Sequence, residues 1–327
     1  MTHCKLKIFL LIFSFSQLLS CSANKTYEMK GNAFGAIYYI SIENNKIINT
    51  NEIYSDIKYI LESIDNSASN YKSNSEISVF NEFKGDTFKP ISSNLFNIIH
   101  KAKIVGDITN GFFDITLGDI KISKGFYLNK KNLKRTIKKN YTYKNIELSE
   151  NNLLKKPFSH VNIDLSGIAK GYAVDLIFNY LISKNISNFI INIGGEIKTH
   201  SKHEDFIIIA IDDPTNNQQF IEEVLLNNNS IATSGTYIDT VNFEGREISH
   251  ITNPKTLKNV SNLNLLVSVI HEECAFADGL ATGLIAMDPE SIINFSNSNG
   301  IASMLTVVKN GRLEKSYSKE FIKYLNN

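Results

Sequence analysis

The sequence predicts an α+β fold with mixed sheets and packed helices. Strand-like and helix-like segments are interspersed along the chain, without the strict βαβ alternation of a doubly wound sheet. The 327 residues are 43% hydrophobic and 20% charged, as is usual for a globular protein. A chain of this length allows one large or two ordinary domains and an ample hydrophobic core.

The individual elements follow from hydrophobic periodicity. Apolar, β-branched runs predict strands, and apolar residues at helical spacing predict helices. The predicted strands are 36–42, 189–193, 206–211 and 263–270. The predicted helices are 52–64, 93–106, 166–182 and 275–287, with a polar, turn-rich loop at 65–76. A sub-domain boundary could fall near residue 160, although nothing there looks like a linker.

The first 20 residues read as a bacterial lipoprotein signal peptide. Lys5 and Lys7 precede an apolar run, 8–19, that polar residues interrupt and that is too short for a good membrane span. The run ends in Leu-Leu-Ser-Cys, which resembles a lipobox with cleavage before Cys21 and lipid on its sulfur. Residues 21–30 would be a short tether and 31–327 the folded domain. The alternative is a plain secretory signal in which Cys21 is incidental.

The expected location is the periplasmic side of the inner membrane, where lipid on Cys21 anchors the protein without a membrane span. The formal net charge of +1 gives no global basic field, so no nucleic-acid partner is expected. A lysine-rich stretch, 130–140, fits a solvated loop or helix face better than a site for acidic lipid headgroups. Cys274 is alone in the folded part, so neither a disulfide framework nor a zinc cluster can form.

The segment Asp278 to Thr282 contains the most informative pair of side chains. In a helix over 275–287 these two residues are i and i+4, one above the other on a single face. A carboxylate and a hydroxyl one turn apart suit a hard cation such as Mg²⁺. A second segment, 164–171, places Asp164 and Lys170 beside small residues. Taken singly, these residues could instead be a helix cap, a surface charge or a salt-bridged carboxylate.

Seven ordered motifs strengthen the functional interpretation. They lie at 31–36, 69–71 with 75–81, 111–118, 164–175, 194–196, 249–256 and 278–282. In this order they resemble the ApbE family, the FAD:protein FMN transferases once described as thiamine-biosynthesis lipoproteins. The resemblance extends from about residue 31 to 287 and implies an ApbE-like architecture related to the T-fold.

The resemblance also implies roles for individual residues. The magnesium ligands would be Asp278, Thr282 and the backbone carbonyl of Gly167. His250 matches the histidine proposed to act near the transferred phosphoryl group, so His250 and Asp278 are the catalytic candidates. The FAD site would be lined by His250 together with Phe34, Tyr71, Phe112, Phe113, Asp114, Asp164 and Lys170.

The chemistry of these residues agrees with the implied roles. A lysine and Mg²⁺ can neutralise the two charges of the FAD pyrophosphate. Aromatic rings offer faces for the isoalloxazine or adenine ring. A histidine can titrate near neutral pH and take a proton from an attacking hydroxyl. Asp278, if buried without a partner, would be explained better by a metal than by core packing.

Three positions depart from the family pattern. Asn253 replaces the usual Asp before the proline, Ala36 replaces a Thr, and Glu196 stands where Asp is commoner. We interpret all three as turn or supporting positions. The cluster of His271, Glu272 and Glu273 could pass for metal ligands, but acidic residues in the first turn of a helix have a sufficient reason in its dipole.

The resemblance implies a Mg²⁺-dependent transferase of a phosphorus-containing group. It would attach FMN from FAD to a threonine of an acceptor protein and release AMP. The implied acceptors are flavoprotein subunits of membrane electron-transport complexes, such as sodium-pumping NADH:quinone reductase. The alternatives are an FAD pyrophosphatase that gives FMN and AMP, a non-catalytic FAD-binding lipoprotein, and a structural lipoprotein without a ligand.

Overall fold

A computed structural model describes residues 25–44, 48–127, 139–202, 205–213, 216–237, 240–243, 245–260, 265–309 and 312–326. Its largest sheet is antiparallel throughout, in the order β1-β2-β6-β7-β10-β13-β14-β15. The strands are β1 (Lys25–Ala33), β2 (Ala36–Asn44), β6 (Asn188–Ile193), β7 (Glu196–Ser201), β10 (Ser230–Gly235), β13 (Leu265–His271), β14 (Ala302–Lys309) and β15 (Arg312–Tyr317).

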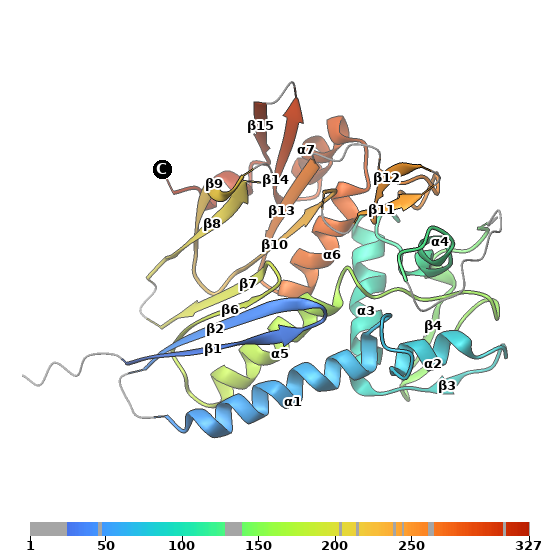
Figure 1. Cartoon of the computed structure of the whole chain (residues 1–327), viewed down its shortest axis with the longest axis horizontal. Helices are drawn as coiled ribbons and strands as arrows, with labels where there is room; N and C mark the ends of the chain where they lie inside the picture. Colours follow the sequence, from blue (N-terminus) through green and yellow to red (C-terminus); the bar gives the residue numbers. More distant parts are fainter. Residues whose placement is uncertain are drawn as a thin grey trace, which may run out of the picture.

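Helices cover one face of this sheet. Figure 1 shows α1 and α5 running along β1, β2, β6 and β7, while α6 packs on β10 and β13. The helices are α1 (Thr50–Ala68), α2 (Glu76–Glu82), α3 (Ser93–Ile108), α4 (Gly118–Ser123), α5 (Ala169–Ser183), α6 (Cys274–Ile285) and α7 (Pro289–Ser298). The main hydrophobic core lies between these helices and the sheet.

The opposite face of the sheet carries a smaller core under the hairpin of β8 (Ile207–Asp213) and β9 (Asn216–Leu226). Strand β13 contributes to both cores: Leu265, Val267 and Val269 face the helices, whereas Leu266 and Ile270 face the hairpin. A strand that is buried on both faces needs apolar residues at successive positions. This explains why β13 is apolar at all positions but Ser268 before His271.

Smaller elements border the helical layer. A three-stranded sheet has the order β3-β5-β4, and β11 pairs with β12. These strands are β3 (Lys89–Pro90), β4 (Glu147–Ser149), β5 (Leu153–Lys155), β11 (Thr240–Phe243) and β12 (Arg246–Ser249). Short 3-10 helices are η1 (Ile115–Leu117), η2 (Tyr143–Asn145) and η3 (Phe321–Tyr324).

The predicted α+β class is confirmed. Five strands of the largest sheet, β1, β7, β10, β14 and β15, were not predicted, and the predicted elements differ from the structure at their ends. The predicted loop at 65–76 is too long, because α1 continues to Ala68 and Ser75 already caps α2. The final turn of α1 remains helical because Ile64 and Ala68 are buried. The helix predicted from residue 166 begins only at Ala169. Residues 164–168 form a separate turn that belongs to the cavity described below.

Several predictions are not tested by the fold. The signal peptide with Cys21, residues 263–264 and most of the lysine-rich stretch lie outside the described residues. The boundary near residue 160 stays a prediction. In the described part of the chain, no helix combines the length and the apolar character needed to cross a membrane.

Candidate active site

All the residues predicted for the folded site line one cavity of about 420 Å³. It lies where the β1–β2 and β6–β7 turns meet the start of α5, the side of α6 and the β11–β12 hairpin. The predicted residues on its wall are Phe34, Tyr71, Phe112, Phe113, Asp114, Asp164, Gly167, Lys170, His250, Asp278 and Thr282. The fold thus brings together segments that are far apart in the sequence, while the role of each residue stays a prediction.

Close contact between the start of α5 and α6 forms the floor of the cavity. The Gly171 backbone N–H donates to Asp278 Oδ2 at 3.1 Å. A Cβ atom at Gly167 would lie 2.8 Å from Thr282 Oγ1, and one at Gly171 only 2.4 Å from the Cys274 carbonyl oxygen. Both glycines are therefore required by the approach of the two segments. Asp278 is buried, but it accepts this hydrogen bond. It is therefore not a buried carboxylate without a partner, and a metal cannot be inferred on that ground.

Three of the charged side chains on the cavity wall lie close together. Lys170 Nζ contacts Glu196 Oε1 at 2.6 Å, and Asp278 is close enough to affect both groups. Burial raises the pKa of Glu196 to about 7 and also raises the pKa of Asp278. Burial lowers the pKa of Lys170, but the two carboxylates outweigh it and the net shift is upward. When both carboxylates are ionised, the three side chains together carry a net charge of −1, because Lys170 balances only one of them.

The donor set of the cavity fits a hard cation. Asp278 offers a carboxylate and Thr282 a hydroxyl 3.4 Å from Ser234 Oγ, and the backbone of Gly167 lies against Thr282 on the same wall. Oxygen donors of this kind suit Mg²⁺, which also keeps several of its waters. No group of three or more His, Cys, Asp or Glu side chains converges on a metal site in the described part of the chain. A cation here would depend on these mixed donors and on the unbalanced negative charge.

Asp164 shapes the turn that precedes α5. Its Oδ1 accepts from the Ser166 backbone N–H at 2.9 Å, and its Oδ2 contacts Lys121 Nζ at 2.5 Å. Burial opposes ionisation of this carboxyl, but Lys121 outweighs burial and the pKa of Asp164 is lowered. Asp164 therefore carries a charge that holds the turn against α4 rather than capping α5.

Two asparagines from the motifs at 69–81 hold the strand-like segment before this turn. Asn81 Nδ2 donates to the Ile163 carbonyl at 2.8 Å, and its Oδ1 accepts from the Ile163 N–H at 2.8 Å. Asn70 Nδ2 donates to the same carbonyl, and its Oδ1 accepts from the Leu165 N–H at 3.1 Å. The amides replace a neighbouring β-strand. These motif residues therefore act by positioning the backbone that leads to Asp164.

Replacing Asn81 by alanine tests this function. The change removes both hydrogen bonds that Asn81 makes to Ile163, one to its buried N–H and one to its carbonyl. An unsatisfied buried group costs about 1–3 kcal/mol, so we expect the free energy of unfolding to fall by about 2–4 kcal/mol. Urea unfolding measures this change. Asn97→Ala is the control, since its side chain makes only a 3.4 Å contact to the Tyr172 hydroxyl, and an equal loss in both variants would contradict the prediction.

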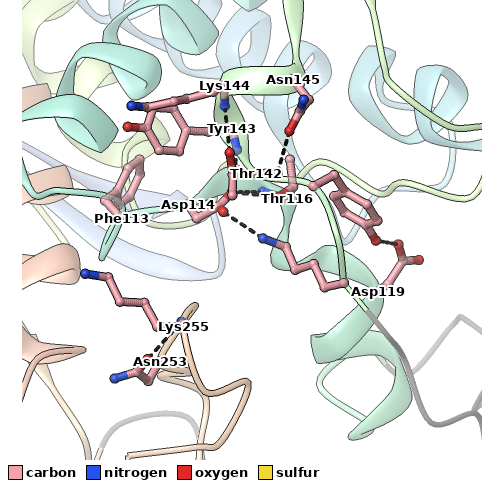
Figure 2. A network of polar contacts seen from close by, with 12 residues as sticks. Phe113, Asp114, Thr116, Asp119, Thr142, Tyr143, Lys144, Asn145, Asn253 and Lys255 are labelled. Atoms are coloured by element: carbon pink, nitrogen blue, oxygen red, sulfur yellow. Dashed lines mark hydrogen bonds and ion pairs between the residues drawn. The ribbon is translucent and has the colours of Figure 1, made fainter.

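Asp114 is the centre of a polar network (Figure 2). Its Oδ1 accepts from Thr116 N, Thr116 Oγ1 and Tyr143 N at 2.9, 2.7 and 3.0 Å, and its Oδ2 contacts Lys139 Nζ at 2.7 Å. The carboxylate is thus occupied by the protein itself. Asp114 borders the cavity, as predicted, and its hydrogen bonds anchor η1 and the backbone of Tyr143.

The aromatic side chains differ in exposure. Phe113 is buried, whereas Tyr71 is 59% exposed and meets Tyr127 edge to face with centroids 5.2 Å apart. Phe34 forms the β1–β2 turn with Gly35, at φ values of +55° and +74°. A positive φ is unusual for a bulky residue, and the two-residue hairpin requires it. The turn places the Phe34 ring on the cavity wall.

His250 follows β12 and borders the cavity beside a turn fixed by Asn253. Asn253 Oδ1 accepts from the N–H groups of Lys255 and Thr256, and its Nδ2 donates to the Ala286 carbonyl at 2.9 Å. A carboxylate has no N–H and could not donate to the Ala286 carbonyl. Asparagine at position 253 therefore adds a hydrogen bond to the end of α6 that aspartate could not make. Lys255 Nζ lies 3.9 Å from the centroid of the Phe112 ring. Figure 2 shows the Lys255 side chain extending toward Phe113, with Asn253 on the far side of Lys255.

The comparisons with known proteins agree with this geometry. The ApbE family pattern matches residues 34–305. The chain belongs to the ApbE family. A Vibrio cholerae protein named FAD:protein FMN transferase is 30% identical over 95% of this chain and 97% of its own length. A relative of the same name from Chlamydia muridarum is 36% identical over 70% of this chain and 74% of its own length.

Solved structures support the same membership. The flavin transferase ApbE from Vibrio cholerae has a TM-score of 0.79 and 27% identity, covering 92% of this chain and all of that chain. An ApbE protein from Thermotoga maritima has a TM-score of 0.80 and 25% identity, covering 93% of this chain and all of that chain. The ApbE-like architecture expected from the motifs is therefore confirmed.

Sequence reasoning did not predict that Glu196 lines this ApbE-type cavity. It predicted a turn or supporting position, and Glu196 does follow the Gly194–Gly195 turn, with its carboxylate buried against Lys170 on the cavity wall. An acidic residue directly after a buried strand and two glycines was the available signal. In contrast, His271, Glu272 and Glu273 lie outside the cavity lining, and Glu273 pairs with Lys101.

Glu196 also predicts a pH dependence of the metal-free protein. The pKa of Glu196 is about 7 in the folded protein, compared with 4.5 for an ordinary glutamate in the unfolded chain. Between pH 4.5 and 7 the folded state therefore binds more protons than the unfolded state. Stability therefore falls as pH rises from 4.5 to about 7, by about 3 kcal/mol, and stays lower above that range. We expect Glu196→Gln to remove this part of the decline in urea unfolding without divalent cations. A decline of unchanged size in the variant would contradict the assignment.

Proposed function

We propose that the chain is a Mg²⁺-dependent FAD:protein FMN transferase. The observation that supports it most is the convergence of a lysine, a histidine, aromatic rings and the Asp278–Thr282 pair on one cavity. The relatives that carry this name match the chain over nearly its full length. Asp278, Thr282 and the Gly167 carbonyl would hold the metal, which would supply positive charge for the pyrophosphate and for the leaving phosphate.

The residues around the metal orient FAD. Lys170 offers its ammonium to the pyrophosphate, and its pairing with Glu196 keeps it at the cavity wall. Tyr71, Phe34 and Phe112 offer ring faces and edges to the flavin and adenine rings. Asp164 and Asp114 hold the backbone of the two turns that border the nucleotide. These contacts fix the phosphate next to His250.

The transfer step is a displacement at the phosphorus of the FMN half. The hydroxyl oxygen of an acceptor threonine forms a bond to this phosphorus, and the bond from phosphorus to the bridging oxygen breaks. The electron pair of that bond leaves with AMP, and His250 accepts the threonine proton. A positioned base of this kind contributes roughly 10²–10⁴-fold to a rate. Water in place of threonine would give FMN and AMP.

The proposal includes an anchored enzyme with a membrane-bound partner. Lipid on Cys21 would hold the enzyme on the periplasmic side of the inner membrane, attached to lipid without a span. The acceptors would be flavoprotein subunits of electron-transport complexes such as sodium-pumping NADH:quinone reductase. Enzyme and acceptor would then share one membrane surface, which raises their effective concentration.

The test is to incubate the purified chain with FAD, Mg²⁺ and an acceptor domain of such a reductase. We expect the acceptor to gain the mass of an FMN phosphoryl ester and AMP to be released, both lost with a metal chelator. AMP and free FMN without acceptor labelling would favour hydrolysis. FAD that binds tightly and stays intact with metal and acceptor would contradict the transferase and leave a flavin carrier.

A further inference from the structure

Two ion pairs connect α5 to β7. In one the lysine lies on α5 and the acid on β7, and in the other the positions of acid and lysine are reversed. Lys170 of α5 contacts Glu196 of β7 at 2.6 Å, and Asp175 of α5 contacts Lys198 of β7 at 2.8 Å. Asp175 also accepts from the first two backbone N–H groups of α6, at 2.9 Å each. The Asp175–Lys198 pair lies away from the cavity lining and serves the packing of the helices. It provides an internal comparison for the first pair.

The Lys170–Glu196 pair is exposed to the cavity on one side only. The Lys170 side chain is 25% exposed, whereas that of Glu196 is 3% exposed. Glu196 Oε1 contacts the ammonium, and its Oε2 is buried without a hydrogen-bond partner in the described part of the chain. An enclosed carboxylate cannot take a proton from a substrate in the cavity. Because its direct contact is with Lys170, we expect its main influence on a ligand to act through that side chain.

The backbone of Glu196 is held firmly by the β6–β7 turn. Gly194 and Gly195 adopt φ values of +62° and +101°, and the Gly195 N–H donates to Asn192 Oδ1 at 3.0 Å. A Cβ atom on Gly194 would lie 2.7 Å from the Cβ of Ala36, so the turn rests directly on β2. Glu196 is the first residue of β7 and pairs with Ile193. The carboxylate is thus fixed to the sheet, unlike the flexible lysine it contacts.

From this geometry we infer that Glu196 is a positioning residue for Lys170. It holds the ammonium at the cavity wall before FAD binds, so that the pyrophosphate meets a preorganised charge. The inference rests on the proposed function, because Lys170 must contact FAD. It assigns Glu196 a ligand-binding effect that depends entirely on Lys170.

A double-mutant cycle tests this dependence. FAD affinity is measured by flavin fluorescence, with Mg²⁺ present, for the full chain and for Glu196→Gln, Lys170→Met and the double variant. We expect Glu196→Gln alone to weaken FAD binding about tenfold and Lys170→Met to weaken it at least as much. Adding Glu196→Gln to Lys170→Met should change the affinity less than about twofold.

The control is Lys198→Met, which breaks the other pair between the same two elements. It should lower the thermal unfolding midpoint and leave FAD affinity unchanged. The inference is overturned if Glu196→Gln alone has no effect on FAD affinity. It is also overturned if Glu196→Gln weakens FAD binding by the same factor with Lys170 present and with Lys170→Met.

If the unmodified chain binds FAD and labels an acceptor while the effects of the two substitutions are additive, only the positioning role fails. If the unmodified chain binds no FAD, the proposed function itself fails.

Discussion

Asp278→Asn should reduce FMN transfer by about 10²–10³-fold or more, because the metal-binding carboxylate is lost. Asparagine keeps the size of the side chain and can still accept from the Gly171 N–H. Since burial raises the pKa of Asp278, the fold disfavours its charge, and a neutral side chain should not lower the stability of the metal-free protein. We therefore expect activity to fall while the metal-free melting temperature is unchanged or higher.

The same variant separates a metal ligand from a structural carboxylate. Mg²⁺ should raise the melting temperature of the unmodified chain by binding its folded state, and this rise should vanish in Asp278→Asn. Asp288→Asn is the matched control, because Asp288 caps α7 and asparagine is an equally good cap. A variant at Asp278 that keeps both transfer and the Mg²⁺-dependent rise would refute the assigned site.

Gly171→Ala should destabilise the fold more than other glycine substitutions in the helices. Its Cβ would lie 2.4 Å from the Cys274 carbonyl oxygen and 2.8 Å from the Ala275 Cα, and neither backbone atom can rotate away. Overpacking of this kind costs about 1–3 kcal/mol, and contact with backbone places this site at the upper end, about 3 kcal/mol. Separation of α5 from α6 would also displace Asp278, so transfer should fall with stability.

Gly279→Ala is the control for this prediction. The three atoms nearest to its added Cβ would all belong to the Val105 side chain, at 3.0, 3.1 and 3.4 Å, and alanine gains about 1 kcal/mol of helix propensity. We expect a change of about 1 kcal/mol or less in the free energy of unfolding. Urea unfolding measures both variants. Equal stabilities for the two would show that the α5–α6 approach is looser than the structure indicates.

The local sequence pattern was sufficient to predict several of the elements around the site. The i and i+4 spacing of Asp278 and Thr282 placed both on one helical face, and both line the cavity. The mostly apolar, β-branched segment of β13 and the Gly194–Gly195 turn were equally visible in the sequence. These features depend on neighbours within a few residues, where periodicity and turn chemistry decide the structure.

The partners of the site residues could not be predicted in the same way. Asn81 binds the backbone of Ile163, and Asn253 binds that of Ala286, across 82 and 33 positions of the chain. Nothing in a local pattern distinguishes these amides from exposed loop residues. Glu196 and Lys170 likewise meet only because β7 lies against α5. Tertiary packing decides such pairs.

The most direct test of the central claim is anomalous diffraction from crystals of the chain grown with FAD and Mn²⁺ in place of Mg²⁺. We expect an anomalous peak within coordination distance of Asp278, Thr282 and the Gly167 carbonyl, next to the pyrophosphate of FAD in the same cavity. A peak elsewhere with FAD bound, or FAD bound away from Lys170 and His250, would contradict it.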